Sequence, residues 1–459
     1  MQHARIAPWL LLPCVAVFAI LAWPWRDASA HVRPEGSEAA EAAAPSPAAA
    51  PDAATQPIAS PSTAPAQVDP APGAAAASAD RARDAAAGAR PVLGSMSYDG
   101  QRRRYVAPYG ERRAVLTVSP QLQQGLEKLL ASYRVPVGAA VLLEPRTGRV
   151  LAMAEHVERG ASGHVALRPI APAASVFKIV TAAALLDRGI APDAEVCFHG
   201  GNHRIQKALL SDDPRRDRRC LTLADALGKS ANVVFAKLAG RALSPEQLRS
   251  EASRFLFNAP IAFEWPVEPS PARIPDDRFE LATTAAGFGP VRMSPLHGAV
   301  LASLVANRGA FVPPRIVEEI DGVPVARGDA RQVLRPEIAA AVARMMQTTV
   351  TDGTARKVFR RERSARGSPL REIAVAGKTG SLAEAAPYRD YSWFVGFAPA
   401  NDPQIAVAAV VVNERRWRVK APFVAREALK AYFADASSRR IRTAALAPTL
   451  LRARGGGVD

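Results

Sequence analysis

Strand-like runs lie at both ends of the region from about residue 95 to 437, and helix-like runs lie between them. Residues 136–155 contain two apolar runs around the turn EPRTG, which predicts an antiparallel hairpin near the start of the region. Three further strand-like runs close it, at 372–381, 391–400 and 403–414. Since strands must pair with other strands, this pattern predicts one sheet assembled from distant parts of the chain, with a helical insertion. We therefore expect an α/β fold of the α+β type.

The segments around these strands predict helices. Residues 119–134 begin with Ser119 as N-cap and Pro120 at the first helical position, and then repeat leucines at helical spacing. Residues 174–188 are apolar and end at Gly189. Further helices are expected at 222–240, 294–307, 335–350 and 423–436.

The first 30 residues predict a membrane anchor or a signal segment. A basic start is followed by an apolar stretch from about Ala7 to Trp25, which is long enough to span a bilayer. Ala28-Ser29-Ala30 resembles a signal-peptidase site, but the apolar stretch exceeds the usual length for a signal sequence. We favour an uncleaved single-pass inner-membrane anchor over a cleaved signal. Both alternatives place the rest of the chain in the cell envelope, in the periplasm.

Composition divides the rest of the chain into three parts. Residues 31–94 are rich in Ala and Pro and lack the aromatic and branched apolar residues that a core requires, which predicts a disordered tether. Residues 95–437 form the expected folded domain, and residues 438–459 form a basic flexible tail. The tether would hold the domain away from a membrane.

The chain is strongly basic, with a formal net charge of +16. Such a charge raises the question of nucleic acid binding, but most of the basic residues are arginines scattered in loops such as 213–220 and 359–367. No basic face interleaved with aromatics and no nucleic-acid motif accompanies them. Attraction to an anionic cell envelope accounts for the charge more simply, so no nucleic-acid partner is expected.

Three cysteines occur in the sequence, and Cys14 lies in the N-terminal apolar stretch. Cys197 and Cys220 are therefore the remaining pair, and a pair without spare thiols fits an oxidising compartment. A disulfide between them, two free thiols, and a metal site with His199 and His203 remain as alternatives. The spacing matches none of the usual zinc patterns, so no metal is expected.

Three short polar motifs interrupt otherwise apolar elements. Ser175 and Lys178 lie three residues apart at the head of an expected helix, so their side chains share one face. Ser230-Ala231-Asn232 lies within another expected helix, and Lys378-Thr379-Gly380 lies at the end of an expected strand. Each motif alone could be a cap, a kink or edge-strand protection. Together, in this order, they are the set found in penicillin-binding proteins and related β-lactamases.

The sequence resembles the transpeptidase domain of the penicillin-binding proteins, in a monofunctional form without a glycosyltransferase domain. The resemblance covers nearly the whole folded region, because stretches outside the three motifs also match the family. These stretches are VLLEPRTGRVLAM, the run 287–317, VTDGTARKV and the run 391–412. It implies a β-lactamase/transpeptidase-like fold, in which an antiparallel sheet packed by helices adjoins a mostly helical subdomain and the active site lies between them.

The resemblance gives five residues catalytic roles that suit their chemistry. Ser175 would attack a peptide carbonyl and become acylated, and Lys178 would accept its proton. Lys178 must be neutral for this step, and burial opposite another cation, Lys378, provides the lowered pKa. Ser230 would pass the proton to the departing amine. Asn232 would orient Lys178 and bind the substrate backbone.

The strand motif would bind substrate. Thr379 and the Ser381 hydroxyl, with Lys378, would contact a terminal carboxylate. Gly380 would leave room for a substrate strand along this edge. The N–H groups of Ser175 and Ser381 would form an oxyanion hole.

Two positions depart from the usual family pattern. Ala174 stands where the family usually has Gly, and Ser381 stands where it usually has Thr but keeps the hydroxyl. The implied enzyme is a serine D,D-transpeptidase that acts on peptidoglycan stem peptides ending in D-Ala-D-Ala, binds β-lactams covalently and needs no cofactor. A separate glycosyltransferase or other wall-synthesis proteins are the candidate partners.

Other functions remain as alternatives. A D,D-carboxypeptidase, an endopeptidase or a β-lactamase would use the same acyl-enzyme, and a non-catalytic sensor or scaffold would only bind penicillin. A β-lactamase needs a deacylating carboxylate, and residues 263–270 (FEWPVEPS) offer only a loop-like candidate.

Overall fold

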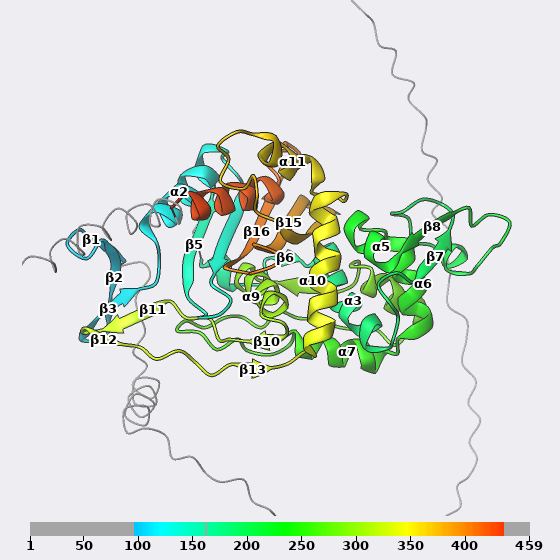
Figure 1. Cartoon of the computed structure of the whole chain (residues 1–459), viewed down its shortest axis with the longest axis horizontal. Helices are drawn as coiled ribbons and strands as arrows, with labels where there is room; N and C mark the ends of the chain where they lie inside the picture. The colour runs from blue at the N-terminus through cyan, green and yellow to red at the C-terminus, as the bar shows by residue number, and fades with distance from the viewer. Residues whose placement is uncertain (1–95, 161–162, 436–459) are drawn as a thin grey trace, which may run out of the picture. The chain divides into compact units, whose positions relative to one another are not determined.

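The fold is built on a central sheet, seen in a computed structural model that describes residues 96–160 and 163–435 (Figure 1). The sheet has five strands in the order β14-β15-β16-β4-β5, and all its neighbours are antiparallel. Its strands are β4 (Val137–Leu143), β5 (Val150–Val157), β14 (Ala376–Ala385), β15 (Tyr388–Ala398) and β16 (Ile405–Asn413). The predicted hairpin therefore joins the last strands of the domain, and the predicted α+β fold is confirmed.

Both faces of this sheet are buried at β4 and β16, which explains why these two strands are almost continuously apolar. Alternate residues point to opposite faces, so Val410 joins one apolar cluster and Val411 joins the other. On one face lies α9 (Pro295–Ala306), which is buried along its whole length. The other face is covered by α2 (Pro120–Ser132) and by the terminal helix, residues 421–435.

A helical subdomain adjoins the β14 edge of the sheet, with α10 in front of it (Figure 1). Its main helices are α3 (Lys178–Asp187), α5 (Leu223–Lys229), α6 (Asn232–Ala242), α7 (Pro245–Arg254), α8 (Arg278–Ala285) and α10 (Pro336–Thr351). Its hairpin comprises β7 (Glu195–Phe198) and β8 (Arg219–Thr222). Among these helices α10 packs on α9 and also on α3 and α5, so sheet and subdomain share one core.

The structure contains a second sheet that was not expected from the sequence. Three of its strands precede the central sheet in the chain, and the sheet packs beside the core. Its strand order is β1-β2-β3-β11-β12. Its strands are β1 (Ser97–Asp99), β2 (Arg104–Tyr109), β3 (Arg112–Leu116), β11 (Val317–Ile320) and β12 (Val323–Pro324). The remaining short elements are η2 (Val165–Leu167), β6 (Ala171–Pro172), η3 (Ala174–Phe177), α4 (Lys207–Leu210), β9 (Arg292–Met293), β10 (Ala310–Phe311), β13 (Arg331–Gln332) and α11 (Arg356–Ser364).

Two expected elements differ from the structure. The helix expected over 222–240 is two helices, because Ser230 takes the left-handed conformation, with φ of 54°, and ends α5. Ala231 is extended, and α6 then begins at Asn232. The strand expected over 372–381 begins only at Ala376 and continues to Ala385, where it turns back into β15.

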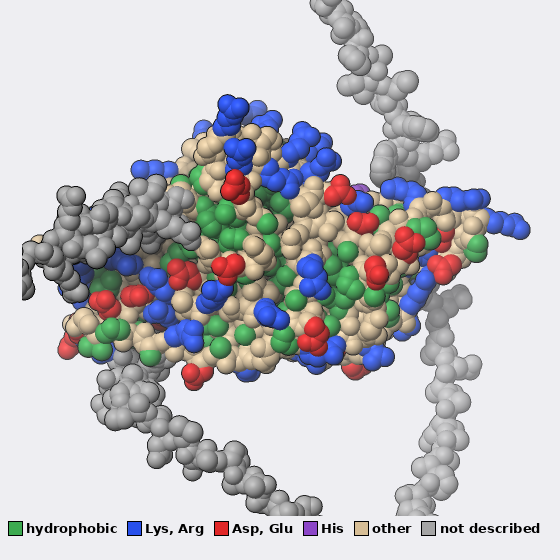
Figure 2. Space-filling view, in the orientation of Figure 1, with side chains coloured by type: hydrophobic (Ala, Val, Ile, Leu, Met, Phe, Trp, Pro, Cys, Tyr) green, Lys and Arg blue, Asp and Glu red, His purple; other side chains and the backbone are tan. Residues whose placement is uncertain are grey.

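Basic side chains gather over α11 (Figure 2), which has the sequence RKVFRRERS. Its one acidic residue, Glu362, is engaged by Arg426 and Lys430 of the terminal helix. This gathering of arginines on a polar helix accounts for part of the net charge that the sequence carries.

The predictions for residues 1–30, 31–94 and 438–459 lie outside the described residues, and the expected domain 95–437 is described from Met96 to Asp435. Within the described ranges, no helix has the length and apolar character needed to cross a membrane.

Candidate active site

Ser175 lies in a tight 3₁₀ turn, η3, that leads directly into α3. Its predecessor Ala174 has a φ of 47°, the left-handed conformation that favours glycine. The carbonyl of Ala174 packs against Gly287, where an added Cβ would lie 2.4 Å from that oxygen. The turn is therefore held in a strained conformation by a close backbone contact. Ser175 lies at the apex of this turn, and 8% of the residue is exposed.

Lys178 is fully buried beside the serine. Its Nζ lies 2.8 Å from Ser175 Oγ and 2.8 Å from Asn232 Oδ1, and it also contacts the carbonyl of Ala286. Burial, and then the positive charge of Lys378, hold the pKa of Lys178 well below its usual value. A neutral amine in contact with a serine hydroxyl can accept the hydroxyl proton, so the pair is suited to nucleophilic catalysis.

Ser230 and Asn232 approach the same lysines from the helical subdomain. The helix break places Ser230 Oγ 2.9 Å from Lys378 Nζ, and Asn232 lies at the first position of α6. Lys378 is fully buried, and burial lowers its pKa to about 7. The motif is therefore both a helix break and part of the polar cluster around the serine.

The third motif lies on β14, at the edge of the sheet. Thr379 Oγ1 is 2.6 Å from Thr354 Oγ1, and Ser381 is exposed at the strand edge. An added Cβ at Gly380 would lie 3.1 Å from Val176 Cγ2 and 3.2 Å from the carbonyl of Ala173. Gly380 thus lets the strand pack closely against the turn that carries the serine.

The loop after β7 fixes the position of Asn232. The carbonyl of Asn202 accepts from the N–H of Asn232 at 2.6 Å, and the carbonyl of His203 accepts from Asn232 Nδ2 at 2.8 Å. The amide group is therefore oriented by one loop and by Lys178 at once, with its oxygen directed at the lysine.

The same loop is fastened to the subdomain at its base. A disulfide joins Cys197 to Cys220 across β7 and β8, so the structure contains the first of the three alternatives for these cysteines. The buried amine of Lys237 on α6 donates to the carbonyl of Cys197 and to Asp217, each at 2.9 Å, and Asp217 also contacts His199. These contacts hold the loop against α6, the helix that begins at Asn232.

A pocket of about 450 Å³ opens onto the cluster. Five of the residues expected from the sequence line it: Ser175, Ser230, Asn232, Thr379 and Ser381. Lys178 and Lys378 lie buried behind them. The lining also contains residues that the sequence did not indicate, namely His203, Phe288, Thr354, Ser392, Trp393, Lys420 and Pro422. Phe288, Thr354, Ser392 and Trp393 lie in stretches that match the family, but none of these stretches was assigned to the site.

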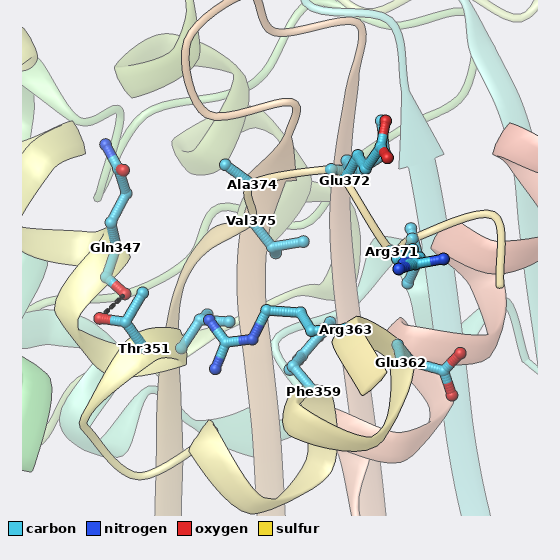
Figure 3. Close-up of a pocket in the computed structure, with 12 residues that line it drawn as sticks. Gln347, Thr351, Phe359, Glu362, Arg363, Arg371, Glu372, Ala374 and Val375 are labelled. Atoms are coloured by element: carbon cyan, nitrogen blue, oxygen red, sulfur yellow. Dashed lines mark hydrogen bonds between the residues drawn. The ribbon is translucent and has the colours of Figure 1, made fainter. Parts of the chain in front are cut away.

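A second pocket, of about 240 Å³, lies between α10, α11 and the segment that leads into β14 (Figure 3). Figure 3 shows Phe359, Glu362 and Arg363 on one side of it and Val375 on the other. It contains none of the three motifs. Within the described ranges no group of three or more His, Cys, Asp or Glu residues could hold a metal ion.

The site defines a class of protein, the serine acyltransferases and hydrolases in which a buried lysine activates the serine. Residues 138–430 match the sequence profile of the penicillin binding protein transpeptidase domain, and the chain belongs to this family.

Known proteins of similar sequence carry names that fit this family. A probable peptidoglycan D,D-transpeptidase, PbpC of Pseudomonas aeruginosa, is 26% identical over 332 residues, which cover 67% of this chain and 56% of that protein. The peptidoglycan D,D-transpeptidase PbpA of Mycolicibacterium smegmatis is 26% identical over 336 residues, 64% of this chain and 66% of that protein. The chain therefore spans between about half and two thirds of the length of these relatives.

Solved structures share the fold. Pseudomonas aeruginosa PBP2 in complex with WCK 5153 is 28% identical, with a TM-score of 0.56 over 72% of this chain and 79% of that chain. The penicillin G acyl-enzyme complex of penicillin-binding protein A from M. tuberculosis is 23% identical, with a TM-score of 0.55 over 72% of this chain and 81% of that chain. The fold resemblance expected from the sequence is confirmed.

Proposed function

We propose that this chain is a peptidoglycan D,D-transpeptidase that cross-links stem peptides through an acyl-enzyme on Ser175. The observation that carries the proposal is the buried amine of Lys178, 2.8 Å from Ser175 Oγ and lowered in pKa by burial and by Lys378. A lowered pKa favours the neutral form of the amine, which is the form that can act as a base. Membership of the transpeptidase family and the names of its relatives support the same activity.

In the first half of the reaction, Lys178 takes the proton of Ser175 while Oγ attacks the carbonyl between the two terminal D-alanines. The new C–O bond gives a tetrahedral oxyanion, which the N–H groups of Ser175 and Ser381 would stabilise. Collapse breaks the C–N bond, and the departing D-alanine amine receives the proton through Ser230, which is hydrogen-bonded to Lys378. The product is an ester of Ser175.

In the second half, an amine from a neighbouring stem peptide attacks this ester. Its proton returns through the same groups, the C–Oγ bond breaks, and a new peptide bond joins the two strands. Water in place of the amine would give a carboxypeptidase or an endopeptidase, so the outcome depends on which acceptor reaches the ester.

Strand β14 would bind the donor, the stem peptide that ends in D-Ala-D-Ala. Thr379 and Ser381 line the pocket with hydroxyl groups, and Lys378 lies buried behind them. Hydroxyls backed by a cation suit a terminal carboxylate, which D-Ala-D-Ala peptides and β-lactams both carry. Gly380 lets this strand lie close to the turn that carries Ser175, which keeps the bound donor near the nucleophile.

The β-lactamase alternative lacks a deacylating carboxylate. Glu264 accepts hydrogen bonds from the N–H groups of Ile316 and Val317, and Glu268 pairs with Arg168. Neither glutamate lines the pocket of Ser175. A slow loss of bound drug, rather than rapid hydrolysis, is therefore expected.

The proposed activity acts on the cell wall, so the domain would work outside the cytoplasm. An N-terminal anchor in the inner membrane and a separate glycosyltransferase partner remain part of this proposal, because the transpeptidase reaction cross-links strands that another activity must supply.

The test incubates the full chain with a donor peptide ending in D-Ala-D-Ala and an amine-bearing acceptor peptide, and identifies products by mass spectrometry. A transpeptidase gives a cross-linked product that has lost one D-alanine, and Ser175→Ala gives none. Hydrolysed donor as the sole product would instead favour the carboxypeptidase, and an unchanged donor would contradict both.

A further inference from the structure

A cationic segment, residues 414–420, connects β16 to the terminal helix. It contains four basic residues, Arg415, Arg416, Arg418 and Lys420, and one acidic residue, Glu414. The acidic residue lies 3.7 Å from Arg389 of the neighbouring strand and is thus already engaged. The segment therefore presents an excess of positive charge.

The segment is fastened to the sheet, although most of its side chains are exposed. The buried side chain of Asn413 accepts from the N–H of Arg418 and donates to the carbonyl of Val419, each at 3.0 Å. The N–H of Ala421 donates to Ser392 Oγ at 3.1 Å. These bonds fix the backbone on both sides of Lys420, so its side chain starts from a defined position.

That position lies on the pocket of Ser175. Ser392 pairs with Ser381 across β14 and β15, and Ser381, Ser392 and Lys420 all line the pocket. Ser381 is thus linked to Lys420 by its strand pairing with Ser392 and by the hydrogen bond from Ala421, the residue after Lys420, to Ser392.

Lys420 is the exposed cation of this pocket. Its Nζ lies 5.9 Å from the ring of Trp417, which is 57% exposed, and it forms no ion pair among the residues that the structure describes. The residues that line the pocket include no Asp or Glu. Lys178 and Lys378, by contrast, are fully buried and hydrogen-bonded to the catalytic serines. An anion on a bound substrate would therefore find Lys420 available.

We propose that Lys420 forms a second anion subsite at the rim of the pocket, which binds a carboxylate carried by the donor peptide upstream of its D-Ala-D-Ala end. The proposal rests on the proposed function, since it takes the terminal carboxylate to be bound at Thr379. A peptide running along β14 from Thr379 past Ser381 extends toward the side of the pocket where Ser381 and Ser392 lie. Trp417 offers an apolar surface beside the amine for the chain that carries the carboxylate.

The test uses two synthetic peptides ending in D-Ala-D-Ala, identical except that one upstream carboxylate is free in the first and a carboxamide in the second. For the full chain, kcat/KM is measured for each peptide, and the ratio of free acid to amide is compared between variants. In Lys420→Met this ratio should fall about 2- to 5-fold, as expected for an exposed ion pair. Lys420→Arg should restore most of it.

Lys357→Met is the matched control, because it removes an exposed lysine from α11, which does not line the pocket. It should leave the ratio unchanged. In the unaltered chain the ratio should also decline as salt is raised, because exposed ion pairs are screened.

A ratio that is the same in Lys420→Met and in the unaltered chain would overturn the subsite. So would an equal loss for both peptides, which would mean that Lys420 acts on the terminal carboxylate or only supports the pocket. Acylation of the unaltered chain by benzylpenicillin is measured in parallel. If acylation occurs and the ratio does not respond, only the subsite fails. If acylation is absent, the proposed function fails and the subsite with it.

Discussion

Lys178 and Lys378 are two fully buried lysines that meet at one serine pocket, and burial together with the charge of Lys378 lowers the pKa of Lys178. One reaches the pocket from a helix and contacts Ser175, and the other reaches it from a strand and contacts Ser230. Two buried ammonium groups would repel each other, so the arrangement favours a neutral Lys178. This relationship is the physical basis of the proposed base catalysis.

Replacing Lys178 by arginine tests whether a neutral side chain is needed. Arginine retains the positive charge and the hydrogen-bonding capacity, but it stays protonated at any accessible pH. We expect Lys178→Arg to lower the rate of acylation by benzylpenicillin by about 10²- to 10⁴-fold, the usual contribution of a general base. An acylation rate close to that of the unaltered chain would show that the charge alone suffices.

The buried amine of Lys378 should make stability depend on pH. Burial lowers its pKa to about 7 in the folded state, whereas an unfolded chain leaves a lysine near its ordinary value of about 10.4. Between these two values the unfolded state binds more protons, so the free energy of unfolding should rise with pH, by about 2 kcal/mol between pH 7 and pH 9.

Urea unfolding of the full chain at the two pH values measures this rise. Lys378→Met has no amine to titrate and should lack about 2 kcal/mol of the rise that the unaltered chain shows. Parallel pH dependences in the two proteins would contradict a buried, titrating Lys378.

The turn that carries Ser175 should accept glycine at position 174 but should not accept a side chain at position 287. Ala174 has positive φ, so Ala174→Gly should stabilise the protein by up to about 1 kcal/mol. Gly287→Ala should force the carbonyl of Ala174 away, because the added Cβ would lie 2.4 Å from it, and should slow acylation at least about 10-fold. Thermal unfolding and acylation kinetics of the two variants check this pair. Normal acylation in Gly287→Ala would refute the contact.

The disulfide should matter for catalysis as well as for stability. It closes a span of 23 residues whose loop fixes Asn232, so Cys197→Ser/Cys220→Ser should lose about 3 kcal/mol of stability. The bound-state acylation rate should also fall about 10-fold, while the affinity for benzylpenicillin changes less.

Cys14→Ser removes the remaining cysteine and serves as the control. A double variant that is destabilised but acylates at the normal rate would limit the disulfide to a structural role.

The sequence predicted the central sheet and the three motifs because each depends on local pattern. Residues 137–143 and 405–412 are continuously apolar, and short runs of this kind favour strands that are buried on both faces. Ser175 and Lys178 share a helix face by spacing alone.

What the sequence did not predict depends on contacts between distant segments. The break at Ser230 requires a left-handed residue that no glycine marks, so 222–240 read as one helix. Lys420 reaches the pocket from a segment whose local pattern is that of a basic loop, and Thr354 lies in the stretch VTDGTARKV, which matches the family but does not by itself indicate a contact with Thr379. The pairing of β3 with β11 joins residues about 200 positions apart, which no local pattern reveals.

The most direct test of the central claim is the intact mass of the full chain after exposure to benzylpenicillin. We expect that the unaltered chain gains the mass of one drug molecule, that the adduct persists for many minutes, and that peptide mapping places it on Ser175. Ser175→Ala should gain nothing. An unaltered chain without an adduct, or an adduct that survives in Ser175→Ala, would contradict the acyl-enzyme on Ser175.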